Sequence, residues 1–423
     1  MSSPKIKISF VSFSFIKGGA SIAARKFSDI SKYFENVELN AIINQDKAGR
    51  IQFIKRLISY VLIKMQYDGN PIKHSLNLFS FPPAVNAFKK NGGDIYHLHW
   101  VNNDTLSIFD LDKIPSGSII TLHDEWLYCG AEHYYSVDDE SFDFIQGYQI
   151  LKKGVYGIHW NYLIWKIKFN KLKSRSDLIF TVPSKWMLLR ASSSLMLKKT
   201  KLRYLPNPID IVLFSPFPTA ECLQFRRDLD FTEHDFIISF GAIGGGSILK
   251  GSNLLEEALA LLAEELPSKI TNKVKLVDFG GDKKGKNCSH GLDHFSIGHI
   301  SSPSELALLY ASVDCVVVPS LVESFGQVAA EALSCETPVI CFDYSGLIDI
   351  VLNEVNGLTA IPYSVRDLAD KLKLIILMSS EKRKKFGAEG RKHIIDNFSY
   401  PVISNLYKKI IDESISLKAD LLG

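Results

Sequence analysis

The chain carries Glu323-Ser324-Phe325-Gly326-Gln327-Val328-Ala329-Ala330-Glu331 shortly after the apolar run Cys315-Val316-Val317-Val318-Pro319-Ser320. A β-branched apolar run, a turn and an Ala-rich segment together predict a parallel strand that leads into a helix. Ser324 is the expected N-cap of that helix, so Glu323 precedes the helix and Glu331 lies about one and a half to two turns inside it. Helical side chains lean toward the N-terminus, where free N–H groups favour an anion. The stretch therefore suits a nucleotide sugar, with its diphosphate at the helix terminus and its hydroxyls on the two carboxylates.

Patterns of strand, turn and helix repeat along both halves of the chain. Helices are expected between the strands, for example over 252–265, 304–311 and 365–378. The expected strands are 5–13, 37–43, 94–100, 118–123 and 178–182 in the first half, and 236–240, 274–279, 315–318 and 338–342 in the second. Such alternation predicts parallel sheets covered on both faces, and 423 residues exceed one ordinary core. We expect an α/β fold of two doubly wound, Rossmann-like domains facing a cleft.

The domain junction is expected at Leu205-Pro206-Asn207-Pro208, where two prolines interrupt regular structure. Residues 1–206 then form the first domain and 207–394 the second. The last amphipathic pattern, Tyr400–Leu417, predicts a final helix.

Composition limits the class of protein. Residues 1–206 hold 28 Lys and Arg against 17 Asp and Glu, whereas the remainder holds 21 against 29. A basic first half suggests an anionic membrane face or a phosphate-bearing substrate, and the alternative is a chance excess of surface Lys. Nucleic acid is disfavoured because no recognition motif accompanies the charge. Six cysteines without CxxC spacing indicate a reduced, cytosolic chain without a structural metal.

Three loops that follow predicted strands carry candidate binding residues. Gly18 and Gly19 let the backbone approach a diphosphate or a sugar, and an ordinary turn is the alternative. The loop from Gly241 to Gly251 holds three consecutive glycines and Lys250, a set that suits a diphosphate; its alternative is a flexible, solvated loop. His123 ends a strand and is followed by Asp124 and Glu125, which could take a proton from an attacking hydroxyl, although a lone strand-end histidine is more often structural. No third ligand accompanies His97 and His99 at metal spacing, so we expect no metal.

Two stretches combine cations with aromatic or aliphatic side chains. For 51–66 we favour an amphipathic helix packed on a sheet over contact with a membrane. For 152–175, which holds seven cations among Trp and Tyr residues, an anionic bilayer interface and a packed helix both stay open. No apolar run approaches the roughly 18 residues of a spanning helix, and the N-terminus lacks a signal-peptide layout. Any membrane association is therefore expected to be peripheral.

Together these residues resemble glycosyltransferase family 4, whose members are retaining, use nucleotide sugars and have the GT-B fold. The resemblance runs through most of the chain and is strongest from about 204 to 357. Its most specific element is the E-x7-E motif, matched by Glu323 and Glu331. By resemblance, Glu323 holds the transferred sugar, the backbone of Ser324, Phe325 and Gly326 holds the leaving phosphate, and Glu331 binds the ribose hydroxyls.

Further positions match the same family. Gly18 and Gly19 match its glycine loop, Lys250 its phosphate-binding lysine, and His123 its active-site histidine. Catalytic roles therefore fall to Glu323, His123 and Lys250, and donor binding also involves Gly241. The final helix, about 395–417, is implied to cross back onto the first domain.

Three positions depart from the family pattern. The Arg that usually precedes the phosphate lysine is missing, because Ala242 follows Gly241. Tyr344-Ser345-Gly346 stands where the family has a double glycine. The neighbourhood of His123 resembles a subgroup active on bacterial surface polysaccharides but lacks that subgroup's downstream cysteine cluster.

The resemblance implies a cytoplasmic hexosyltransferase, peripheral on the inner face of the cell membrane. It would move sugar from a UDP- or GDP-sugar to a hydroxyl of a lipid-linked oligosaccharide in cell-surface polysaccharide biosynthesis, without a metal or other cofactor. Two alternatives stay open: a GT-B enzyme of other chemistry, such as a sugar-nucleotide epimerase or a phosphorylase, and a non-catalytic binding protein.

Overall fold

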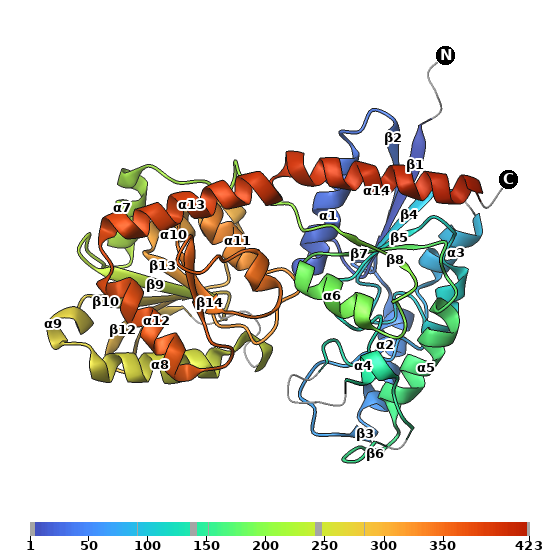
Figure 1. Ribbon diagram of the computed structural model, residues 1–423, viewed down its shortest axis with the longest axis horizontal. Coiled ribbons are helices and arrows are strands. Elements are labelled where there is room, and N and C mark those ends of the chain that lie inside the picture. The colour runs from blue at the N-terminus through green and yellow to red at the C-terminus, as the bar shows by residue number, and fades with distance from the viewer. Residues whose placement is uncertain are drawn as a thin grey trace. The chain divides into compact units, whose positions relative to one another are not determined.

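The computed structural model describes residues 5–90, 92–135, 142–150, 152–241, 248–282 and 284–420. The chain forms two compact units. The first unit contains the residues up to Pro208 together with those from Ile403 onward. The second unit runs from Ile209 to Val402. The sequence placed the corresponding breaks after 206 and near 395. Figure 1 shows the elements of each unit.

The first unit is built on a parallel sheet of six strands in the order β2-β1-β4-β5-β7-β8. Every residue of β4, β5 and β7 is buried, as expected for strands covered on both faces. The strands are β1 (Ile6–Ser12), β2 (Val37–Ile43), β4 (Ile95–His99), β5 (Ile119–Thr121), β7 (Ile179–Val182) and β8 (Lys201–Tyr204). The helical elements are α1 (Gly19–Ser31), α2 (Arg50–Ile63), α3 (Pro82–Lys90), η1 (Ile108–Lys113), α4 (Asp143–Gln146), α5 (Trp160–Leu172), α6 (Lys185–Ser193) and α14 (Tyr400–Asp420). A separate antiparallel pair joins β3 (Gln66–Tyr67) to β6 (Tyr156–Gly157).

The last helix, α14, packs on the first unit. Tyr407 Oη lies 2.7 Å from His97 Nδ1, Lys418 Nζ donates to Asp94 O, and Arg203 pairs with Glu413. These contacts join the C-terminal end of the chain to the sheet that its N-terminal end begins.

The second unit holds a seven-stranded sheet in the order β11-β12-β10-β9-β13-β14-β15, in which only the β11–β12 pairing is antiparallel. Its strands are β9 (Phe236–Gly241), β10 (Val274–Phe279), β11 (Gly285–Ser289), β12 (Leu292–Gly298), β13 (Cys315–Val318), β14 (Val339–Phe342) and β15 (Gly357–Ala360). Its helical elements are α7 (Thr219–Asp228), η2 (Ile248–Lys250), α8 (Ser252–Glu265), α9 (Ser268–Thr271), α10 (Pro303–Ser312), α11 (Gln327–Ser334), η3 (Ser345–Asp349), α12 (Val365–Leu377) and α13 (Ser380–Phe398). Both units are doubly wound and Rossmann-like, so the predicted fold class is confirmed.

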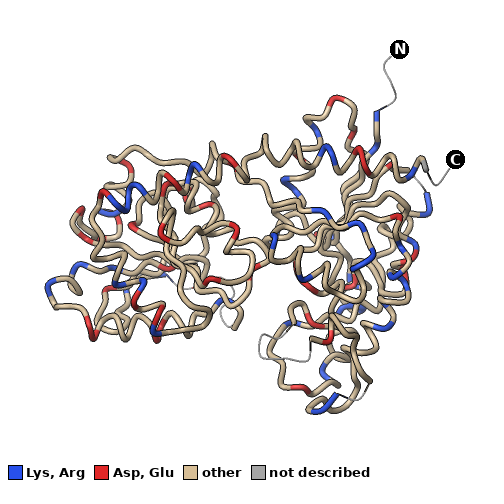
Figure 2. The backbone as a smooth tube through the Cα atoms, viewed as in Figure 1, with Lys and Arg blue, Asp and Glu red and all other residues tan. Residues whose placement is uncertain are grey.

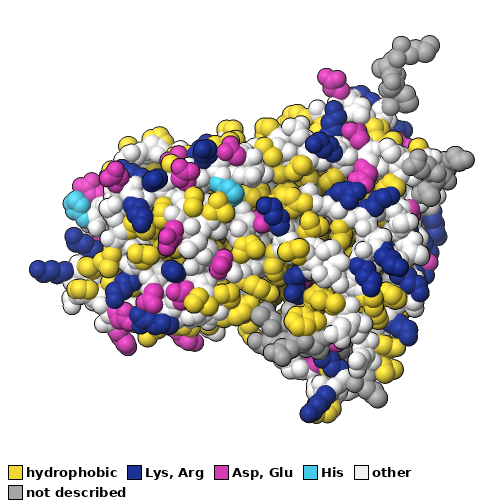
Figure 3. Space-filling model, in the orientation of Figure 1, with side chains coloured by type: hydrophobic (Ala, Val, Ile, Leu, Met, Phe, Trp, Pro, Cys, Tyr) yellow, Lys and Arg dark blue, Asp and Glu magenta, His cyan; other side chains and the backbone are white. Residues whose placement is uncertain are grey.

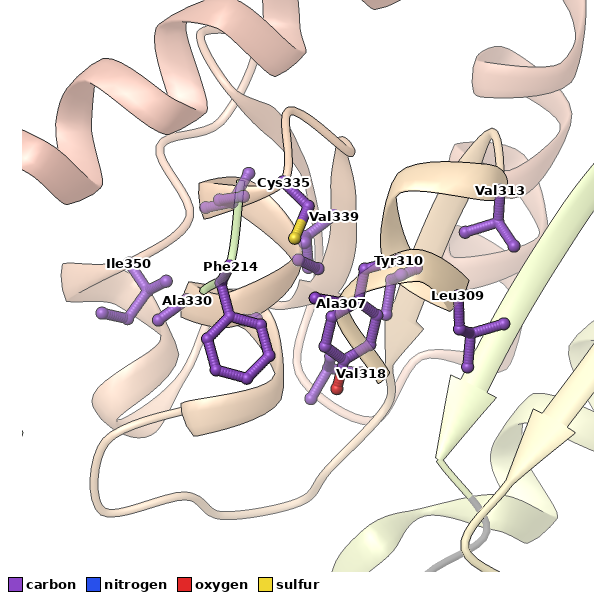
Figure 4. Close-up of a cluster of buried hydrophobic side chains, with 14 of the residues drawn as sticks. Phe214, Ala307, Leu309, Tyr310, Val313, Val318, Ala330, Cys335, Val339 and Ile350 are labelled. Atoms are coloured by element: carbon purple, nitrogen blue, oxygen red, sulfur yellow. The ribbon is translucent and has the colours of Figure 1, made fainter. Parts of the chain in front are cut away.

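A hydrophobic cluster under α11 supports the segment 323–331, which contains both Glu323 and Glu331. Figure 4 shows the rings of Phe214 and Tyr310 among small apolar side chains from α10, α11 and the neighbouring strands. The two ring centroids lie 6.3 Å apart. Ala329, Ala330, Ala332 and Leu333 of α11 are buried. The Ala-rich sequence therefore lets the helix lie close to the sheet and fixes the loop before it.

Basic residues occur along much of the first unit, from β1 to α6 (Figure 2). Within the described residues, every helix is too short or too polar to cross a bilayer.

Candidate functional site

The helix after β13 begins later than the sequence suggested. Gly326, in a left-handed conformation with φ 103°, is the N-cap of α11, so the prediction of Ser324 as N-cap was wrong. A Cβ at Gly326 would also lie 2.8 Å from Leu347 Cδ2. Both the conformation and the close contact select glycine here. Because glycine has no side chain to cap the first turn of α11, the N–H groups of that turn have to find other partners, and an anion suits them.

Lys250 and Glu323 form an ion pair at the start of this helix. Lys250 Nζ donates to Glu323 Oε1 at 2.5 Å. Glu323 raises the pKa of Lys250 by its charge and its hydrogen bond, against the opposing effect of burial. The sequence assigned these residues separately to phosphate and sugar, and the structure places them side by side.

Two serines hold Glu323 in position. Ser320 Oγ donates to Glu323 Oε1 at 3.0 Å, and Glu323 N donates to Ser345 Oγ at 3.0 Å. Ser345 has φ 62°, a conformation that favours glycine. The family that the chain resembles has two consecutive glycines here, and Ser345 stands at the first of these two positions. The Ser345 hydroxyl adds a hydrogen bond that glycine could not make.

Backbone contacts fix Lys250 against the end of β13. Leu321 N donates to Leu249 O at 2.8 Å. Gly251 has φ 63° and its Cα lies against the Pro319 carbonyl, leaving no space for a Cβ. The backbone contacts of Leu249 and Gly251 thus fix the position of Lys250.

Glu331 lies one turn inside α11 and is buried. Gln327 Nε2 donates to Glu331 Oε1 at 2.6 Å, and the carboxylate contributes to a raised pKa of Tyr310, mainly a result of burial. Ser324 is partly exposed. The Phe325 side chain is in the core against Phe398, so only its backbone can face a ligand.

Gly241 ends β9, and a Cβ there would lie 3.4 Å from the Phe279 ring. The glycine run Gly244–Gly246 that follows it in the sequence lies outside the described residues.

Gly18 and Gly19 begin α1 in the first unit. Gly18 has φ 92°, and neither glycine would bring a Cβ within 4 Å of another atom. Ser14 Oγ accepts hydrogen bonds from Ile16 N and Lys17 N and donates to Asp46 Oδ1 at 2.5 Å. The loop is therefore held at its base and open at its glycines, which leaves backbone accessible to a ligand.

His123 follows β5 and forms a pair with a second histidine. His99 Nδ1 and His123 Nε2 lie 2.9 Å apart, and burial lowers the pKa of His123 to about 4 and that of His99 well below its usual value. Both rings are therefore neutral at pH 7. His99 Nε2 is buried without a partner among the described residues.

The unpartnered nitrogen selects a tautomer. A buried N–H without an acceptor is rarer and costlier than a buried lone pair, so His99 carries its proton on Nδ1 and donates to His123. His123 then carries its own proton on Nδ1, the nitrogen for which no described residue provides a partner. His123 can thus donate a hydrogen bond to a bound oxygen.

The two acids beside His123 are not free bases. Glu125 is buried, pairs with Arg190 and accepts a hydrogen bond from Tyr128 Oη. Asp124 accepts hydrogen bonds from Trp100 Nε1 and His133 Nδ1, both at 2.6 Å. Its pKa is lowered by His133 and these hydrogen bonds, against the opposing effect of burial. Both acids therefore hold the loop through these partners, and their suggested role in taking the acceptor's proton stays a prediction.

His97 serves the fold. Its Nδ1 contacts Tyr407 Oη, and its Nε2 lies 2.8 Å from Thr121 Oγ1.

Sequence reasoning missed the roles of Ser320, Ser345 and His99. Only the period-two spacing of His97 and His99 gave a signal, and it could not say which partner each ring meets.

Part of the second unit matches a known protein family. Residues 225–393 match the family described as "Glycosyl transferases group 1". The match covers less than half of the chain and lies within the second unit. The group 1 segment includes Lys250, Glu323, Ser345 and α11, the residues that the second unit brings together.

Relatives and solved structures agree with that result. The chain is 28% identical over 220 residues to a D-inositol 3-phosphate glycosyltransferase of Corynebacterium aurimucosum, covering 49% of this chain and 50% of that protein. It is 28% identical over 156 residues to an alpha-galactosylglucosyldiacylglycerol synthase of Streptococcus pneumoniae, covering 34% of this chain and 38% of that protein. The chain spans half or less of the length of these curated relatives.

The fold is similar over nearly the whole chain. A sucrose-phosphate synthase from Thermosynechococcus elongatus has a TM-score of 0.63 at 17% identity, covering 97% of this chain and 100% of that one. Anabaena HepE, solved with UDP and glucose, has a TM-score of 0.62 at 15% identity, covering 96% and 100%. At these identities the likeness shows the fold, which is the GT-B fold.

Proposed function

We propose that this chain is a retaining glycosyltransferase of family 4. It transfers a hexose-type sugar from a UDP- or GDP-sugar to a hydroxyl of a lipid-linked oligosaccharide in cell-surface polysaccharide biosynthesis. The observation that carries the proposal is the Lys250–Glu323 pair beside the start of α11, within the segment that matches group 1 glycosyltransferases. Similarity to a structure solved with UDP and glucose supports a nucleotide sugar as donor.

Lys250 and α11 would stabilise the leaving diphosphate. An ammonium group has three N–H donors, and one of those on Lys250 meets Glu323. The other two can meet phosphate oxygens while the first keeps Glu323 oriented toward the sugar. The start of α11 adds backbone N–H groups, so no metal ion is required to neutralise the developing charge.

The reaction would proceed on one face of the sugar. The acceptor oxygen attacks C1 on the side from which the diphosphate leaves, the bond from C1 to the leaving oxygen breaks, and that oxygen takes the acceptor's proton. Configuration at C1 is thus retained without a covalent enzyme intermediate. The contribution of the protein is positioning and stabilisation of charge.

His123 would act on the acceptor side. Its Nδ1–H can donate to a sugar oxygen, and its low pKa keeps it neutral, so it orients by hydrogen bonding and not by charge. A lipid-linked acceptor would bring the chain to the inner face of the cell membrane.

The test is a transfer assay with labelled UDP- and GDP-sugars and product analysis. Glu323→Gln should lower turnover about 100-fold or more while the free energy of unfolding changes little. Glu257→Gln makes the same change at an exposed position of α8 and should leave turnover intact. Normal turnover in Glu323→Gln, or a product with inverted configuration, would defeat the proposal. An epimerised donor, or transfer from a sugar phosphate, would instead identify a GT-B enzyme of other chemistry.

A further inference from the structure

The amphipathic helix α2 is inverted relative to an ordinary surface helix. Its buried residues are the polar Gln52 and Ser59. Six apolar side chains are 41–74% exposed: Ile51, Phe53, Ile54, Leu57, Ile58 and Val61. The sequence favoured a helix packed by its apolar face on the sheet, and this prediction was wrong.

Polar partners inside the first unit explain the inversion. Gln52 Nε2 donates to Asp104 O at 2.6 Å, and Ser59 Oγ donates to Asp104 Oδ1 at 3.1 Å. Lys55 Nζ donates to Ser80 O, and Arg56 lines a cavity of about 450 Å³ that Asn77 and Asp104 also line. Because the inward face of α2 is committed to polar groups, its apolar face has no place in the core.

The exposed apolar face is continuous. Positions 51, 54, 58 and 61, with 53 and 57 beside them, follow the helical period and form one stripe along the helix. Elsewhere, on the face drawn in Figure 3, hydrophobic side chains lie among charged and polar ones, as is ordinary for a protein surface. A continuous apolar stripe of this length is typical of a docking surface.

Charge identifies the kind of partner. From Lys47 to Tyr67 the chain contains five cations and no Asp or Glu. Lys47 and Arg50 are exposed at the start of α2, and Lys64 is exposed just after its end. Tyr67, exposed beyond that end, pairs across β3 and β6 with the exposed Tyr156. Apolar side chains flanked by cations and tyrosines match the acyl, phosphate and interfacial layers of an anionic bilayer.

A second copy of the chain fits this face poorly. A two-fold contact that pairs α2 with itself in antiparallel orientation sets Arg50 against Lys64 of the other copy. No acidic residue on the helix could offset that repulsion.

Part of the other basic stretch, the helix α5, is taken up by the fold. Ile164, Trp165 and Leu172 of α5 are buried. Lys168 is buried as well, and its Nζ donates to the carbonyls of Trp126 and Gly130. The interface that the sequence considered for α5 therefore fits α2 better.

We propose that the outer face of α2 docks on an anionic lipid bilayer, with the helix axis in the plane of the interface and Phe53, Leu57 and Val61 among the acyl chains. Cations at the two ends of the helix bind lipid phosphates. This docking does not depend on sugar transfer, because binding is measured without donor or acceptor.

The experiment is co-sedimentation of the full chain with vesicles of phosphatidylcholine containing phosphatidylglycerol, or of phosphatidylcholine alone. The wild type should bind the anionic vesicles more strongly, and salt should weaken that binding because exposed charges are screened. Combined Phe53→Ser, Leu57→Ser and Val61→Ser should reduce binding at least tenfold. The matched control, Val355→Ser with Leu374→Ser and Leu377→Ser, removes equally exposed side chains from the second unit and should bind like the wild type.

Two further measurements test whether α2 is the surface that binds the bilayer. Lys47→Glu with Arg50→Glu and Lys64→Glu should abolish the preference for anionic vesicles. Hydrogen exchange of the wild type should show protection over 50–67 when vesicles are added, a result that needs no variant to fold. Absence of binding, retained binding by the Ser variant, or a dimer that the Ser variant converts to a monomer would overturn it.

Discussion

Lys250 Nζ donates a hydrogen bond to Glu323 Oε1 at 2.5 Å, although 73 positions separate the two residues in the chain. The contact joins η2, which follows the glycine-rich loop, to the loop between β13 and α11. It places a lysine and a carboxylate from distant segments together at one helix start. It also means that a phosphate has to share Lys250 with Glu323.

Lys250→Met is expected to weaken UDP binding more than it weakens the fold. The pair is partly exposed, so its loss should cost about 1 kcal/mol of unfolding free energy or less. Loss of charge-assisted hydrogen bonds to phosphate should weaken binding by about tenfold or more. Calorimetric titration with UDP measures the effect, and Lys269→Met on α9 serves as the control. Unchanged affinity would remove Lys250 from the phosphate site.

Ser345 should tolerate glycine better than alanine. Its φ of 62° suits glycine, and its Oγ accepts the Glu323 N–H. Both variants lose the hydrogen bond, but Ser345→Gly also relieves the left-handed strain of a Cβ, about 1 kcal/mol, whereas Ser345→Ala keeps that strain. Denaturant unfolding of the three proteins gives the order, and an alanine variant more stable than the glycine variant would contradict it.

Gly326→Ala and Gly19→Ala separate folding from function. At Gly326 a Cβ would contact Leu347 and φ is 103°, so alanine should lower the free energy of unfolding by about 1–3 kcal/mol.

At Gly19 a Cβ would contact no other atom and the backbone is already helical, so alanine should leave the unfolding midpoint unchanged or raise it. If Gly19 admits substrate to the backbone of α1, transfer activity should still fall in that variant. Full activity would remove Gly19 from the site.

Tyr407→Phe should destabilise the first unit. The Tyr407 hydroxyl is buried and contacts His97 Nδ1 at 2.7 Å, and its removal leaves a buried ring nitrogen unpaired at a cost of about 1–3 kcal/mol. The unfolding midpoint reports the loss. Tyr33→Phe alters a residue that is 82% exposed and should change nothing, so equal effects of the two variants would exclude a special role for the His97 contact.

Stability of the first unit should fall on mild acidification. Burial lowers the pKa of His97, His99, His123 and His133, with Asp124 opposing the shift at His123 and His133. Between pH 6.5 and 4 the unfolded chain binds more protons at these rings than the folded chain does, so folding weakens as pH decreases. With a folded pKa of about 4, His123 alone accounts for about 2 kcal/mol at pH 5.

Denaturant unfolding at pH 7.5 and pH 5 measures that dependence. His123→Asn should make it shallower, because it removes a group that titrates only in the unfolded state over this range. A variant with the same dependence as the wild type would show that His123 titrates normally in the folded chain.

Sequence patterns alone predicted the α/β class and most of the longer elements. β2, β10, β13 and α8 have the bounds expected from pattern alone, because buried parallel strands and amphipathic helices impose periods that need no tertiary partner to recognise. The strands β8, β11, β12 and β15 were missed. All four lie at or next to a sheet edge, and their short or mixed polar sequences give no clear apolar run.

Contacts between distant segments set which side chains meet, and local patterns do not encode them. The pairing of Lys250 with Glu323 depends on Gly251 lying against Pro319, a contact between distant segments that no local pattern encodes. The inversion of α2 depends on Asp104, which binds Gln52 and Ser59 and so draws the polar face inward. Periodicity shows that a helix has two faces, whereas the polar groups already buried beside it decide which face turns to solvent.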